Sequence, residues 1–168
     1  MTIVFGDTSQ GSPGMRLQTF CEQGFEFKVL ADVCAVGHYV PLAETPHISI
    51  VPGQPHTWKA VLPTLRKPGE QFRLGIKCED LWGNPTPLAQ GQFRLEPTLV
   101  VNGLPDGFDF PLGEKSQLID GLTVNQPGLL RIKLLDESNT VVAEAGPLLI
   151  RDGISGYWGD LHLSLIHI

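Results

Sequence analysis

The feature that most constrains this chain is a strict alternation of apolar and polar residues over positions 71–79. The apolar members are Phe72, Leu74, Ile76 and Cys78, and charged residues such as Arg73 and Lys77 stand between them. Because successive side chains of a β-strand point to opposite faces, this period of two gathers the apolar residues on one face. The stretch therefore predicts a strand with one face in a core and the other in solvent.

Shorter segments repeat this pattern between turns, and none of ten residues or more has the 3.6-residue period of a helix. The predicted strands cover residues 25–33, 47–51, 58–62, 92–96, 99–101, 118–124, 129–135, 141–143 and 147–150. The 19 glycines and 14 prolines suit many short strands joined by turns. We therefore expect an all-β protein in which helix is scarce.

Strands at this spacing favour immunoglobulin-like β-sandwiches. Pro97 interrupts the ladder after residues 92–96, and a loop is expected over 103–113. A Pro-Gly pair launches a strand that ends in Asp80, and a second Pro-Gly pair launches one that ends in Asp136. We therefore predict two consecutive modules, a first over 1–97 and a smaller second over 98–152.

The turn after the first of these strands has the sequence Asp80-Leu81-Trp82-Gly83-Asn84-Pro85. An aspartate in this position can accept hydrogen bonds from the backbone N–H groups of its own turn. Glycine at position 83 permits a positive φ. We therefore predict a tight turn organised by Asp80.

Bulk charge argues against a nucleic-acid partner, because the formal net charge is −6 and the basic residues are scattered. No apolar segment approaches the roughly 18–20 residues needed to span a bilayer, and no export signal is visible, so no membrane is expected. Cys21, Cys34 and Cys78 form no Cys-x-x-Cys pair, which predicts reduced core thiols and a cytoplasmic location. If Met1 is an internal methionine of a longer gene, export stays open.

The stretch Tyr157-Trp158-Gly159-Asp160-Leu161-His162 is the one place where residues look arranged for chemistry. It resembles the first metal-binding motif of the PHP (polymerase and histidinol phosphatase) metallohydrolase superfamily. More closely, it resembles a related bacterial family of unknown function. Segments 11–20, 50–53 and 80–85 occur in the order associated with the N-terminal region of that family, so the resemblance spans residues 2–162.

The resemblance implies that residues 153–162 are the first strand of a truncated PHP-like β/α barrel. His162 would then bind a divalent metal, and Asp160 would orient a ligand or bind the metal itself. The metal would generate a hydroxide and neutralise charge on a phosphoryl or similar oxyanion. The superfamily pattern is His-x-His, whereas this chain has Ser164 at the second position. The partner so implied is the C-terminal catalytic domain of the same protein, and no activity is expected of residues 1–168 alone.

The last six residues, 163–168, resemble the translation of a transposase adapter used in sequencing libraries. We therefore expect a non-native tail, as at the end of an assembled metagenomic fragment, and His167 is not a candidate ligand.

Two functions remain open from the sequence. The leading one is the non-catalytic N-terminal β-sandwich region of a PHP-like metal-dependent hydrolase, possibly a phosphoesterase. The alternative is a free-standing carbohydrate- or protein-binding module, in which Trp82 would contact the ligand, together with Trp58 if both were exposed.

Three further histidines have no metal-binding spacing, and nothing orients a histidine toward Cys34. Those histidines are His38, His47 and His56.

Overall fold

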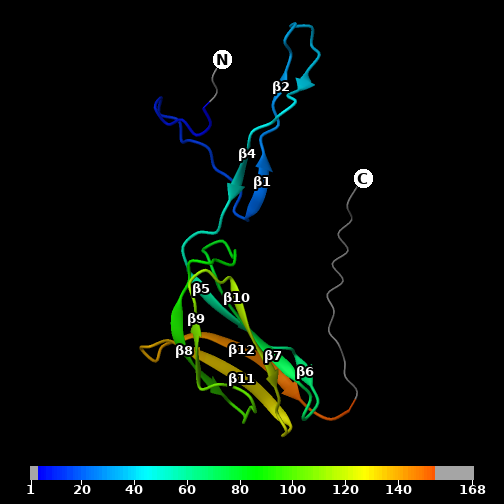
Figure 1. Cartoon of the computed structure of the whole chain (residues 1–168), viewed down its shortest axis with the longest axis vertical. Coiled ribbons are helices and arrows are strands. Elements are labelled where there is room, and N and C mark those ends of the chain that lie inside the picture. Colours follow the sequence, from blue (N-terminus) through cyan, green and yellow to red (C-terminus); the bar gives the residue numbers. More distant parts are fainter. Residues whose placement is uncertain (1–3, 154–168) are drawn as a thin grey trace.

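A computed structural model describes residues 4–153 of the chain, in which twelve β-strands and no α-helix occur (Figure 1). The all-β prediction is confirmed. Over this described range, no helix is long and apolar enough to cross a membrane.

Eight of the strands form a β-sandwich of two sheets. The three-stranded sheet has the order β10–β7–β5, and the five-stranded sheet has the order β6–β12–β11–β8–β9. The bounds are β5 Thr57–Val61, β6 Leu65–Arg66, β7 Phe72–Glu79, β8 Gly91–Pro97, β9 Gly107–Phe110, β10 Ser116–Leu122, β11 Gly128–Leu135 and β12 Val141–Ile150. Every pairing is antiparallel except that of β6 with β12, which is parallel.

The strand order is that of the immunoglobulin fold. In the usual lettering, β5, β7 and β10 take the places of strands A, B and E, and β8, β11 and β12 take those of C, F and G. The short β6 extends the second sheet beside β12. The predicted immunoglobulin-like sandwich is therefore present as a single module of eight strands.

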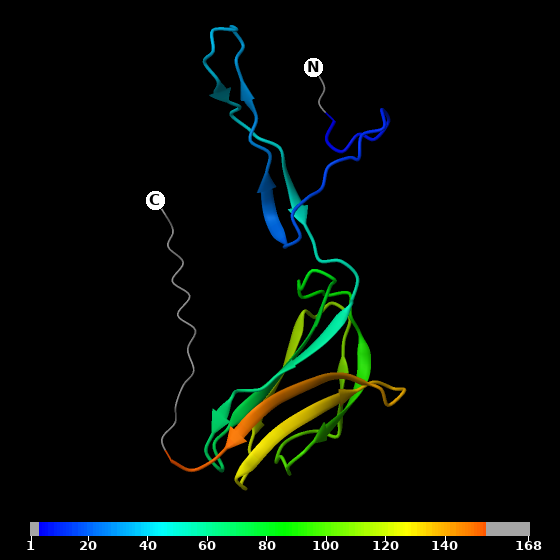
Figure 2. The same cartoon turned by 180° about the vertical axis from the view of Figure 1, so that it is seen from behind.

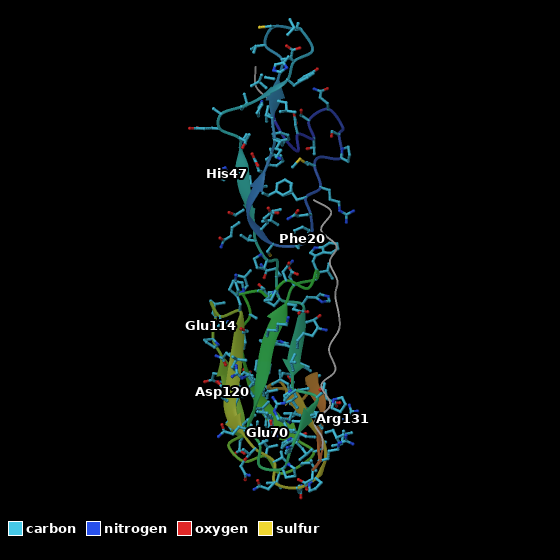
Figure 3. The ribbon with its side chains drawn as sticks, turned by 90° about the vertical axis from the view of Figure 1, so that its right-hand side faces the viewer. Phe20, His47, Glu70, Glu114, Asp120 and Arg131 are labelled. Atoms are coloured by element: carbon cyan, nitrogen blue, oxygen red, sulfur yellow. The ribbon has the colours of Figure 1, made fainter. Side chains whose placement is uncertain are left out.

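One hydrophobic core fills the space between the two sheets. Alternation on β7 predicted its inward face, and Leu74, Ile76 and Cys78 are indeed buried there. From the facing sheet, Leu130 and Ile132 of β11 are equally buried. Outward-facing positions carry charge, as Figure 3 shows for Asp120 and Arg131. Asp120 pairs with Arg73 at 3.3 Å, and Arg131 pairs with Glu144 at 2.6 Å.

The predicted boundary between residues 97 and 98 falls inside this sandwich and needs correction. β7 pairs with β10 and β8 pairs with β11, so strands before and after the boundary share both sheets. The expected 103–113 loop contains β9, which pairs with β8. Alternation identifies the buried face of a strand but not its partner, because pairing links segments distant in sequence. Pro97 ends a strand without ending the domain.

Residues 4–50 form an arm that extends away from the sandwich (Figure 2). Two short antiparallel pairs make up its ladder, β1 with β4 and β2 with β3. The bounds are β1 Glu22–Glu26, β2 Leu30–Ala31, β3 Val40–Pro41 and β4 His47–Ile50. Between β1 and β2 the ring of Phe27 stacks on Phe5 with centroids 4.6 Å apart.

The half-buried strand predicted over 25–33 is therefore wrong in two respects. It is split between β1 and β2, and Val33 is 91% exposed. The alternation is present, but the two-stranded ladder has no second sheet to cover either face.

Candidate functional site

The turn that follows β7 is organised by the carboxylate of Asp80, as the sequence predicted. Asp80 is buried, and its Oδ1 accepts hydrogen bonds from the backbone N–H groups of Trp82 at 2.8 Å and Asn84 at 2.9 Å. Gly83 has a φ of 86°. This is the left-handed region that a residue with a Cβ rarely adopts. The side chain and the glycine together fix the course of residues 80–84.

The second carboxylate oxygen of Asp80 reaches outside its own turn. Asp80 Oδ2 accepts the backbone N–H of Gly53 at 2.9 Å and the side-chain amide of Asn84 at 3.0 Å. These donors hold the pKa of Asp80 well below its ordinary value, with the Gly53 N–H as the largest cause and the Asn84 and Trp82 donors adding to it. The carboxylate stays ionised and binds the segment before β5 to the turn after β7.

Asn84 continues this network into the arm. Its Nδ2 donates to the carbonyl oxygen of Thr19 at 2.8 Å, and its Oδ1 accepts the N–H of Cys21 at 3.1 Å. Behind the turn, the buried Thr86 hydroxyl donates to the carbonyl oxygen of Gly53 at 2.8 Å. Three segments distant in sequence thus meet at one joint, which we call the Asp80 joint: residues 16–21, 50–53 and 80–86.

A cavity of about 330 Å³ lies at the Asp80 joint and is lined by all three segments. Its wall includes the indole of Trp82, which is 56% exposed, and the side chain of Val51, which is 72% exposed. Arg16 also lines it. The cavity is therefore lined by both an aromatic and a basic residue, a combination able to contact a planar or polar ligand.

Trp58 and Trp82, the two tryptophans proposed as ligand contacts, lie in different surroundings. Trp58 on β5 is half-buried, and its ring packs edge-on against Phe93 and Phe110 with centroid distances of 4.6 and 5.0 Å. It lines a separate cavity with Gln90, Gln92 and the turn after β11. Of these two tryptophans, only Trp82 is exposed and lies at the Asp80 joint. Trp58 packs against the core.

The turn after β11 repeats the bonding of the Asp80 turn. Asp136 Oδ1 accepts the N–H groups of Ser138 and Thr140, both at 2.9 Å, and Asn139 takes the positive φ of 59° that Gly83 takes in the first turn. The sequence echo between the two strands is therefore a repeated turn. Within residues 4–153, the Asp136 carboxylate accepts no hydrogen bond from outside its turn, which distinguishes it from Asp80.

Over residues 4–153, no cluster of three or more His, Cys, Asp or Glu side chains is placed to hold a metal ion. Asp80 itself does not suit a metal, since N–H donors already occupy both of its oxygens. His56 contacts the hydroxyl of Thr57 at 2.8 Å. The ligands suggested by the resemblance, Asp160 and His162, lie outside the described residues. So do the 163–168 tail and all of the predicted 153–162 strand except Gly153.

The cysteine prediction needs a correction. Cys78 is buried in the core as expected, and burial raises the pKa of its thiol. Cys21 and Cys34 are exposed, because both lie in the arm, where no core exists to receive them.

No protein-family model and no curated protein matches the chain. Among solved structures, the chain is similar to FdeC, described as a novel, broadly conserved Escherichia coli adhesin that elicits protection against urinary tract infections. The identity is 17%, the TM-score is 0.34, and the match covers 77% of this chain and 41% of that one. The chain thus spans less than half of the FdeC chain.

Proposed function

We propose that residues 1–152 are the non-catalytic β-sandwich region of a PHP-like, metal-dependent hydrolase whose catalytic domain begins at residues 153–162. The observation that carries this proposal is the convergence at the Asp80 joint. The sequence segments on which the resemblance rests, 11–20, 50–53 and 80–85, contribute residues to one hydrogen-bonded site. If this chain has the same N-terminal region as the family it resembles, the segments that the two have in common should pack together, and these three segments do.

The end of the sandwich also supports the proposal. β12 ends at Ile150, which is buried, and it is the last strand of the sandwich within residues 4–153. The motif that begins at Tyr157 follows four residues after Gly153. A self-contained sandwich leaves the next segment available to start a second folding unit.

In the proposed enzyme, His162 would bind a divalent metal, and Asp160 would orient a ligand or bind the metal as well. Such a metal would supply a hydroxide nucleophile and neutralise the charge of a phosphoryl-type oxyanion. Catalytic metal sites commonly use three protein ligands, so the remaining His, Asp and Glu residues would come from strands that follow His162 in the intact gene. The sandwich binds neither metal nor substrate in this arrangement. Its role is to carry the catalytic domain.

The test starts from an intact copy of the gene, read past the codon for His162. We expect a continuation with His, Asp and Glu at strand ends, and expression of the whole protein should give a hydrolase that cleaves phosphate esters when loaded with Mn²⁺, Mg²⁺ or Zn²⁺. His162→Ala should abolish both activity and bound metal. His56→Ala, a histidine of the sandwich, is the matched control and should leave both unchanged. A stop codon directly after His162, or full metal content in His162→Ala, would overturn the proposal.

Exposure of Trp82 favours a second candidate, a binding module that contacts carbohydrate or protein at the Asp80 joint. The indole is accessible beside a cavity, and aromatic faces of this kind stack on sugar rings or pack against partner side chains. Glycan-array binding that is lost in Trp82→Ala but kept in Leu118→Ala, an equally exposed apolar residue on β10, would support it. Equal binding by both variants would exclude Trp82 as the contact.

A further inference from the structure

The outer end of the arm presents an unusual concentration of exposed apolar side chains. We call residues 30–42 the arm tip. Six large side chains in this segment are between 45% and 91% exposed: Leu30, Val33, Val36, Tyr39, Val40 and Leu42. Single exposed apolar residues are normal on a protein surface, but a contiguous group marks an interaction site.

The arm tip is organised by hydrogen bonds within its own segment. β2 and β3 pair through Leu30 with Pro41 and Ala31 with Val40. At the turn between them, the carboxylate of Asp32 accepts the N–H of Val36 at 3.2 Å and that of Gly37 at 2.7 Å. Such pre-organisation lowers the entropy cost of binding. A two-stranded ladder is only marginally stable in water, so covering its faces would stabilise it.

Charge indicates what can cover the arm tip. The chain as a whole carries a formal net charge of −6, so most surfaces of two copies repel each other. Within residues 30–42, Asp32 is the only Asp, Glu, Lys or Arg, and its oxygens are already engaged by backbone N–H groups. Two arm tips can therefore face each other with little repulsion, because the one carboxylate in each tip already accepts hydrogen bonds from its own turn.

We propose that the arm tip is a self-association surface, and that its partner is the arm tip of a second copy of this chain. Leu30 pairs with Pro41 and Ala31 pairs with Val40, so apolar side chains stand on both faces of the β2–β3 pair. A two-fold dimer uses the same residues of both copies, so each apolar side chain in the contact counts twice. The arm projects from the sandwich (Figure 1), which leaves room for two tips to meet.

Cys34 provides a built-in probe of this contact. It is exposed and lies between Val33 and Val36 in the turn of the arm tip, whereas Cys21, also exposed, lies at the base of the arm near the Asp80 joint. In a dimer through the tips, the two copies of Cys34 are held close together and the two copies of Cys21 are not.

The experiment measures the mass of the 168-residue chain by sedimentation from micromolar to millimolar concentration, together with cross-linking by a short bismaleimide. We expect a dimer whose fraction rises with concentration, cross-linked in wild type and in Cys21→Ser but not in Cys34→Ser. The double variant Val33→Lys with Val36→Lys should weaken dimerisation by at least about ten-fold.

The matched control places the same two charges on an exposed face of the sandwich, as Val61→Lys with Leu118→Lys. These side chains are 58% and 56% exposed, and this variant should dimerise as wild type does. Circular dichroism verifies that each variant is folded. A chain that stays monomeric throughout, a double arm variant that dimerises like wild type, or a monomeric chain that binds phosphatidylcholine vesicles through the tip would overturn the proposal.

Discussion

The single sandwich makes a definite prediction for the variants Leu74→Ala and Leu130→Ala. Leu74 lies on β7, before residue 97, and Leu130 lies on β11, after it, and both are 0% exposed. Because both side chains belong to one core, either substitution should destabilise the whole sandwich. Two independent modules would respond separately.

The magnitude follows from the atoms removed. Replacing leucine by alanine deletes three carbon atoms, which at about 0.8 kcal/mol per buried methylene group is roughly 2.4 kcal/mol of transfer free energy. The remaining cavity adds to this, because a close-packed core relaxes only in part. We therefore expect each variant to lower the free energy of unfolding by about 3–4 kcal/mol. For a domain of this size that corresponds to a fall in Tm of roughly 12–25 °C.

Urea unfolding followed by tryptophan fluorescence and by far-UV circular dichroism tests the prediction. Trp58 packs against Phe93 and Phe110 in the core, so its fluorescence reports on the sandwich directly. Both probes should give one coincident transition, moved to lower urea by either substitution with little change in slope. Leu118→Ala, at an exposed position of β10, should change stability by less than about 0.5 kcal/mol. Two transitions, each moved by only one of the core variants, would refute the reasoning.

Three further predictions concern local features. Asp80→Asn should reduce the loss of stability at acid pH. The lowered pKa of Asp80 in the folded chain stabilises the fold above about pH 4, where the carboxyl of the unfolded chain is also ionised, and this stabilisation is lost as the pH falls below 4. Measurements of Tm from pH 7 to 2 should therefore show a smaller fall for the variant than for wild type. Gly107→Ala should cost about 1–3 kcal/mol in urea unfolding, because its Cβ would lie 2.7 Å from the carbonyl oxygen of Phe93, whereas Gly24→Ala, with no described atom within 4 Å of its Cβ, should be tolerated. Asn84→Ala should increase protease cleavage within residues 16–21, since Asn84 holds that segment through Thr19 and Cys21. The Tm of the sandwich should fall by less than it does in Leu74→Ala. Unchanged cleavage would contradict this role of Asn84.

Local pattern predicted the strands of the sandwich well and their grouping poorly. The alternation over 71–79 identifies the residues of β7 that face the core, since face is a property of the strand itself. Pairing of β7 with β10 joins residues that are 39 to 50 positions apart, and nothing in either segment specifies that partner. The boundary at residue 97 was therefore a local inference about a non-local property.

The Asp80 joint was predictable only in part. Asp80, Gly83 and the course of the turn follow from turn chemistry, and the structure confirms them. The contacts of Asp80 with Gly53 and of Asn84 with Thr19 depend on where the arm enters the sandwich, which no local pattern describes. In the same way, alternation over 25–33 gave no sign that the second sheet needed to bury those residues was missing.

The parallel pairing of β6 with β12 also has a mechanical consequence. The N–H of Leu149 donates to the carbonyl oxygen of Thr64 at 2.9 Å, and the N–H of Arg151 donates to that of Arg66 at 3.1 Å. A pulling force applied to the two ends of the sandwich draws these neighbouring strands in opposite directions along their lengths. The load then acts on these two hydrogen bonds in shear, so they must break together and not one after another. The sandwich is thereby suited to transmit tension between the arm and whatever follows residue 153.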